Sequence, residues 1–138
     1  MIRKPPRACE LRAGLWAYRY LRDLRQSLAI GQVDVGVAPP VLPSSAVRGV
    51  EAVLRRADPT CLEAALVRQR WLSAQGMLRD VVIGVTAPSD GFMAHAWLDD
   101  PTEAATGRPW HELTRLTARD ARTRGASQSR KWLPGLEP

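Results

Sequence analysis

The apolar residues of this chain change their period near Gln75-Gly76. Before this point they recur every three or four positions, which is typical of amphipathic helices. After it come a β-branched run at residues 80–86 and an alternating pattern at residues 92–98, which predict strands. The order of the two patterns predicts an α+β fold, with helices first and a small antiparallel sheet after them. The 138 residues can bury one hydrophobic core without disulfides.

Three helices are expected in the first half of the chain. Apolar residues at helical spacing predict the first over residues 7–28, and a linker rich in Gly, Pro and Val follows at residues 31–43. The second helix is expected at about residues 46–56. The third is expected at about residues 59–74, with Gly76 in its C-cap region.

Two strands and a weaker segment are expected after the helices. Turn-forming residues at positions 87–91 separate the β-branched run from the alternating segment, so the two should form an antiparallel hairpin. Residues 113–117 have a weaker pattern that fits a short extended or helical segment. A polar tail rich in Arg and Ser, with expected partial disorder, begins near residue 119.

Cys61 is the strongest candidate for a nucleophile. It follows Asp58-Pro59, and Asp is a favoured N-cap while Pro is a favoured first helical residue, so Cys61 is expected as the third residue of the third helix. Free N–H groups and the helix dipole favour a thiolate there. Such a thiolate can attack a peptide carbonyl and form a thioester, with the Cys61 N–H as one oxyanion donor. Cys9, in the first helix, is interpreted as a structural thiol.

His95 is the candidate base. Alternation places it on the same strand face as Met93 and Trp97, opposite Phe92, Ala94, Ala96 and Leu98. A lone histidine in a strand is often structural, but the other histidine, His111, lies in a weakly patterned region. His95 would accept the thiol proton and later protonate the leaving amine.

Asp58 has two possible roles. As an N-cap, its carboxylate would be occupied by backbone N–H groups, and its charge would oppose formation of a nearby thiolate. As a catalytic carboxylate, it would have to reach the ring nitrogen of His95 that faces away from the thiol. The residues themselves leave these two roles nearly balanced.

The formal net charge of +6 raises the question of nucleic-acid binding. The arginines are spread through every segment, and no basic run is interleaved with aromatic residues as a single-strand groove would require. Nucleic acid is therefore not an expected partner. An acidic peptide or protein suits the charge equally well.

A cytoplasmic location is expected. The two cysteines form no disulfide framework, and residues 1–15 lack the apolar region of a signal peptide. The least charged stretch, residues 27–47, contains too much Gly and Pro for a membrane-spanning helix. No metal or other cofactor is expected, because the cysteines and histidines lack a recognised ligand spacing.

Four blocks of sequence, in order and at characteristic spacing, carry a resemblance to a known family. The blocks are Thr60–Leu66, Trp71-Leu72 with Gly76, Val82–Val85, and Ala94–Leu98. Together they resemble the transglutaminase-like leader peptidases of lasso-peptide biosynthesis, in the standalone form. The resemblance covers residues 58–100 and implies a Cys-His-Asp protease of papain-like lineage. In such a protease, the nucleophile helix packs on the antiparallel sheet that carries the histidine.

The resemblance also implies the remaining roles. It assigns the third catalytic position to Asp58, three residues before the nucleophile. The chain departs from the family pattern after Trp97, so Asp99 and Asp100 are rivals for that role. The resemblance implies a transglutaminase-like domain over residues 1–118, followed by the tail at residues 119–138. Within the domain, the part up to residue 57 is expected to be helical, and the part from residue 58 is expected to be catalytic.

The implied substrate is a lasso precursor peptide, whose leader the enzyme removes. The implied partners are a separate leader-binding protein and an ATP-dependent cyclase, and no cofactor is implied. Two alternatives stay open. The same scaffold could resolve its thioester with an amine or act on side-chain amides, or the chain could be a peptide-binding module without catalysis.

Overall fold

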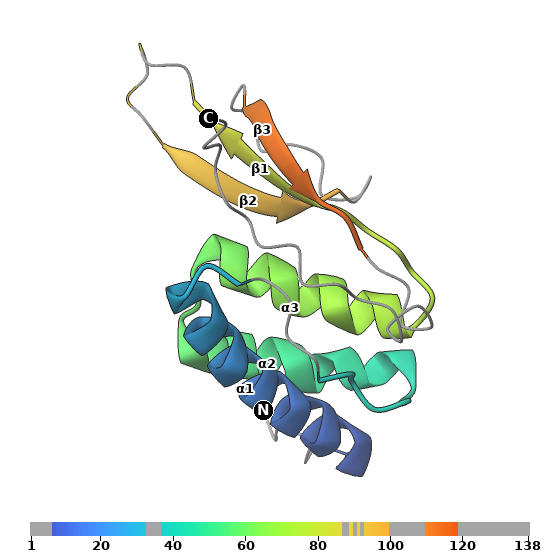
Figure 1. The fold of residues 1–138 in the computed structure, drawn as a ribbon. Coiled ribbons are helices and arrows are strands. Elements are labelled where there is room, and N and C mark those ends of the chain that lie inside the picture. The colour runs from blue at the N-terminus through green and yellow to red at the C-terminus, as the bar shows by residue number, and fades with distance from the viewer. Residues whose placement is uncertain are drawn as a thin grey trace, which may run out of the picture.

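The computed structural model describes residues 7–32, 37–86, 89, 91, 93–99 and 110–118. Its elements, in chain order, are α1 (Ala8–Ala29), η1 (Ser44–Ala46), α2 (Val47–Ala57), α3 (Cys61–Ala74), β1 (Val81–Val85), β2 (Ala94–Leu98) and β3 (His111–Leu116). Figure 1 shows the sheet on one side of α3 and the pair α1 and α2 on the other. The expected α+β fold is confirmed. The tail expected from residue 119 lies outside the described residues, as does Asp100.

The three helices share one apolar core. Leu24 of α1, Val50 of α2 and Trp71 of α3 are each at most 2 % exposed. The ring of Trp16 stacks on Tyr20 with a centroid distance of 5.1 Å and lies 5.9 Å from the ring of Trp71. These large side chains fix the position of α1 against α3, because aromatic pairs contribute both buried area and a preferred geometry.

The helices α1 and α2 approach each other at two glycines. A Cβ atom on Gly49 of α2 would lie 1.9 Å from the carbonyl oxygen of Glu10, and one on Gly14 of α1 would lie 3.3 Å from the carbonyl oxygen of Gly49. The backbone of α1 therefore occupies the space that a side chain at position 49 would need. This contact explains a glycine in the interior of α2, where it otherwise costs helix stability.

The described strands form an antiparallel sheet in the order β2-β1-β3. The expected hairpin is confirmed, since β1 pairs with β2 in a register that sets Gly84 opposite His95 and Ile83 opposite Ala96. The weaker segment beyond residue 110 forms the third strand, β3, which pairs with the other side of β1. Its side chains are mostly exposed, which explains its faint sequence pattern. The face that carries Ala96 packs on α3, and the opposite face carries His95.

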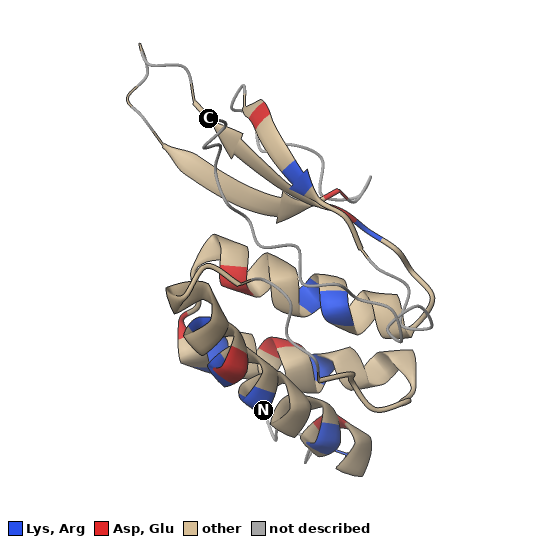
Figure 2. Ribbon diagram, viewed as in Figure 1, with Lys and Arg blue, Asp and Glu red and all other residues tan. Residues whose placement is uncertain are grey.

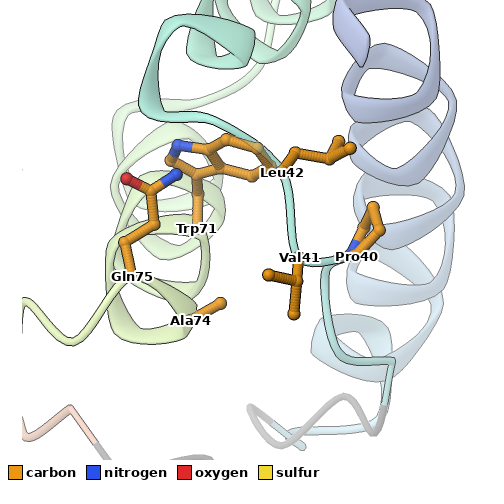
Figure 3. Close-up of a pocket in the computed structure, with 6 residues that line it drawn as sticks. All are labelled: Pro40, Val41, Leu42, Trp71, Ala74 and Gln75. Carbon is orange, nitrogen blue, oxygen red and sulfur yellow. The ribbon is translucent and has the colours of Figure 1, made fainter.

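The described part of the linker between α1 and η1, residues 37–43, runs beside α1. The Trp16 indole donates a hydrogen bond of 3.4 Å to the carbonyl oxygen of Val37 and so attaches this segment to α1. On the side toward α3 lies a small hollow of about 190 Å³. Figure 3 shows its lining, which is apolar apart from the Gln75 amide: Pro40, Val41, Leu42, Trp71, Ala74 and Gln75.

Within the described ranges, no helix has both the length and the apolar character needed to cross a membrane.

Candidate active site

The helix that carries Cys61 begins at a capping box. Thr60 is the N-cap, and its side-chain oxygen accepts a hydrogen bond of 3.2 Å from the N–H of Glu63. The Glu63 carboxylate in turn accepts one of 2.9 Å from the N–H of Thr60. Cys61 is therefore the first residue of α3. The expectation from the sequence that it is the third residue is wrong. The reason is that the reciprocal Thr-x-x-Glu pair satisfies two backbone donors, whereas an Asp cap at position 58 would satisfy one.

The prediction that Asp58 caps this helix is wrong. Asp58 instead ends α2 in the left-handed conformation, with φ 47° and ψ 58°. It is the one non-glycine residue with positive φ among those described, and Asp tolerates this conformation better than most residues. Its exposed carboxylate has no hydrogen bond or ion pair within the described part of the chain. The carboxylate is therefore not occupied by capping.

The Cys61 thiol meets β2 directly beside His95. The sulfur accepts a hydrogen bond of 3.4 Å from the backbone N–H of Ala96, the residue that follows His95. The thiol is exposed, so a substrate can reach it. A backbone donor aimed at the sulfur stabilises negative charge there. The fold thus brings Cys61 into contact with Ala96, 35 residues away, and so brings together the two sequence blocks that carry the candidate nucleophile and base.

The His95 ring packs among tryptophans. Its centroid lies 5.9 Å from the ring of Trp97 and 5.3 Å from the ring of Trp110. His95 and Trp97 share one face of β2, as the alternation predicts. Trp110 reaches the same face from just before β3. No hydrogen bond between the ring and the Cys61 thiol is present in the described structure.

The tryptophan beside His95 depends on a glycine in the central strand. A Cβ atom on Gly84 would lie 2.7 Å from the Cη2 atom of Trp97. The indole therefore lies across the strand at the one position without a side chain. The flat Trp97 indole therefore lies next to His95, the candidate base.

A comparison with family models identifies the family of this chain. A model described as the transglutaminase-like superfamily matches residues 10–118 of the chain. The chain belongs to this superfamily. Comparisons with curated proteins and with solved structures found no match. The superfamily includes cysteine proteases.

In this transglutaminase-like domain an arginine of α1 holds the start of the Cys61 helix. The Arg25 Nε donates a hydrogen bond of 3.0 Å to the Glu63 carboxylate, and its Nη2 donates one of 3.1 Å to the carbonyl oxygen of Ala57. Arg25 therefore joins the end of α2 to the first turn of α3. Asp58 lies within the turn between these two contacts.

The charge of Glu63 is stabilised by these partners. Burial alone would raise the pKa of Glu63, but the Thr60 N–H and the Arg25 guanidinium outweigh it, and the pKa falls below its ordinary value. The carboxylate is 8 % exposed and stays ionised between its two donors. The sequence contained the Thr-x-x-Glu signal for the capping box, but it contained no signal for the contact with Arg25, 38 residues away.

The rival carboxylate Asp99 is engaged elsewhere in this transglutaminase-like domain. Its Oδ2 lies 2.7 Å from Nη1 of Arg115 on β3. The same guanidinium contacts Glu112 and lies 3.6 Å from Asp80. Asp99 follows His95 by four residues of extended chain, a separation of about 13 Å. Asp99 therefore pairs with Arg115 and not with His95.

Within the described ranges, no three His, Cys, Asp or Glu side chains gather closely enough to hold a metal ion.

Proposed function

We propose that this chain is a cysteine peptidase that removes the leader from a lasso precursor peptide. One observation carries the proposal: the exposed thiol of Cys61, at the start of α3, accepts a hydrogen bond from the backbone beside His95. Membership of the transglutaminase-like superfamily supports a cysteine peptidase or acyltransferase chemistry. The four sequence blocks that resemble the lasso leader peptidases favour the peptidase.

The reaction assigns each residue a step. His95 accepts the proton of the Cys61 thiol, and the sulfur attacks the scissile carbonyl carbon. The resulting oxyanion lies near the first N–H groups of α3. Those of Cys61 and Leu62 have no acceptor within the described part of the chain, which supports their use as donors.

Collapse of the tetrahedral intermediate breaks the C–N bond. His95 donates its proton to the leaving amine, which becomes the free N-terminus of the core peptide. Water then attacks the leader thioester with His95 as base, and the products are the leader carboxylate and the free thiol. The proposal includes a rotation of the His95 ring toward the thiol, because catalytic hydrogen bonds are often completed when substrate binds.

Asp58 is the proposed third catalytic residue. Its carboxylate is free of the helix cap, and the left-handed turn holds it three residues before Cys61. Both features support a role in orienting His95. The pairing of Asp99 with Arg115 favours Asp58 over that rival.

We further propose that the peptidase acts with a separate leader-binding protein, in the cytoplasm, before an ATP-dependent cyclase closes the macrolactam. The free amine that the peptidase releases is the group that such a cyclase requires. An acyltransferase that resolves the same thioester with an amine is the second candidate, since the scaffold serves either chemistry.

The test is mass spectrometry of a lasso precursor incubated with the chain and a leader-binding protein. Wild type and the matched control Cys9→Ala should yield separate leader and core masses. Cys61→Ala should leave the precursor intact, and Asp58→Asn should slow cleavage. An intact precursor with wild type would contradict the peptidase, and an amine adduct of the leader would support the acyltransferase.

A further inference from the structure

The helix α1 presents an apolar stripe to solvent. Leu11, Leu15 and Tyr18 are 61 %, 50 % and 58 % exposed. Their spacing of four and three residues places them on one face of the helix. The opposite face carries the buried residues of the helical core. Scattered exposed apolar side chains are ordinary, but a continuous stripe on one helix indicates an interaction surface.

An open hollow of about 290 Å³ adjoins this stripe, between α1 and residues 37–40 of the linker. Leu15 and Trp16 of α1 form one side, Val37 and Pro40 form the other, and Arg12 and Arg19 stand at the rim. The hollow beside Trp71 in Figure 3 lacks such charged residues. The hollow on α1 therefore combines an apolar lining with two cations.

The two rim arginines have no ion-pair partner among the described residues. Neither Arg12 nor Arg19 forms an ion pair with any residue that the structure describes, whereas Arg22 on the same helix is 3.5 Å from Asp23. Figure 2 shows that basic positions recur along α1. An apolar hollow between free guanidinium groups complements an apolar side chain flanked by carboxylates. We propose that this face of α1, the α1 docking face, binds an acidic amphipathic segment of a partner protein.

Charge argues against the two terminal segments and a second copy of the chain as occupants. The tail at residues 119–138 contains five basic and two acidic residues, and residues 1–6 contain two basic and no acidic residues, so neither complements the rim. In a symmetric dimer formed through this face, the basic rim of one copy would lie against the basic rim of the other. Charge therefore favours a different protein as the occupant.

The α1 docking face is separate from the candidate active site. Arg19, the residue of this face nearest to Arg25, precedes it by six residues, which places the two about 9 Å apart along the helix and about 120° apart around it. Arg25 is the residue of α1 that contacts the turn before Cys61. A partner on this face leaves the thiol accessible, and the inference does not depend on the proposed reaction.

The test uses two fluorescein-labelled helical peptides of about 18 residues with a leucine stripe. One peptide has Glu along both borders of the stripe, and the other has Lys at the same positions. Fluorescence anisotropy with the full chain should show binding of the Glu peptide, weakened by salt, and roughly tenfold weaker binding of the Lys peptide. Amide shifts in NMR spectra should map to α1.

Variants locate the binding. The double variant Arg12→Gln/Arg19→Gln should bind the Glu peptide roughly fivefold more weakly, or worse. The control is Arg48→Gln/Arg56→Gln, which replaces two exposed arginines of α2 and should leave the affinity unchanged. Arg12→Glu with Arg19→Glu should reverse the preference to the Lys peptide. Thermal unfolding of each variant confirms that it folds.

Three results would overturn the inference. They are equal binding of the two peptides, binding that the charge reversal leaves unchanged, and self-association of the wild-type chain that Leu15→Ser abolishes.

Discussion

Arg25 and Glu63 form an ion pair, with 3.0 Å between Nε and Oε2, that joins α1 to the first turn of the Cys61 helix. The contact crosses 38 residues of sequence and ends two residues beyond the thiol. Arg25 balances the negative charge of Glu63, which would otherwise lie uncompensated within one turn of Cys61. It therefore acts as a positioning residue for the candidate nucleophile.

Arg25→Gln should slow alkylation of Cys61 by roughly three- to tenfold, because the unpaired Glu63 charge opposes the thiolate and the turn loses a contact. The rate with iodoacetamide, measured in a Cys9→Ser background, tests this without any substrate. Arg22→Gln is the matched control on the same helix. Adding Glu63→Gln should restore much of the rate, and an unchanged rate in Arg25→Gln would refute the positioning role.

The stability of the chain should depend on pH through Glu63. The pKa of Glu63 in the folded chain lies below its ordinary value of 4.5, so its contribution is complete above that value. The contribution is lost as the pH falls through the lowered pKa of the folded state. Urea unfolding between pH 6 and pH 3 should show a smaller loss of stability in Glu63→Gln than in wild type. Parallel curves for the two proteins would contradict the prediction.

Gly49→Ala should destabilise the fold by about 3 kcal/mol or more, since the new Cβ would overlap the Glu10 carbonyl oxygen and force α1 and α2 apart. Gly14→Ala is the matched control, because its Cβ would lie 3.3 Å from its nearest neighbour and alanine favours the helix. Its stability should change by less than about 1 kcal/mol. Similar losses in urea unfolding for the two variants would contradict the close crossing.

Gly84→Ala should cost about 1–3 kcal/mol, because its Cβ would overlap the Trp97 indole. The loss should shrink when Trp97 is first replaced by Leu, so the two changes should be strongly non-additive in a double-mutant cycle. Additive losses of unfolding free energy would show that the indole does not lie over Gly84.

The sequence predicted the elements more closely than their ends. The periodicity of α1 and the hairpin of β1 and β2 are strong local signals, and both were correct. The start of α3 was predicted from Asp58-Pro59, and the Thr-x-x-Glu pattern at residues 60–63 was overlooked. The observed helix begins at that pattern, because the pair satisfies backbone donors at both of its ends.

The remaining features of the site depend on contacts between distant segments. Alternation predicts that His95 and Trp97 share a face, but it cannot predict that Trp110 joins them from another segment. The contact of Arg25 with Glu63 could not be predicted either, because the position of Arg25 in the pattern of α1 is that of an ordinary solvent-exposed arginine. The Cys61 contact with Ala96 likewise requires the packing of α3 on the sheet.

The contact between Cys61 and Ala96 also affects how the chain behaves at high concentration. In the described sheet β2 is an outer strand, and the Ala96 N–H points away from β1 toward the thiol. Unsatisfied donors on an outer strand can recruit a strand from another molecule and start aggregation. Replacing Cys61 by alanine leaves the Ala96 N–H without an acceptor, whereas replacing it by serine keeps an acceptor beside this donor. Serine is therefore the better replacement for an inactive protein that must remain monodisperse.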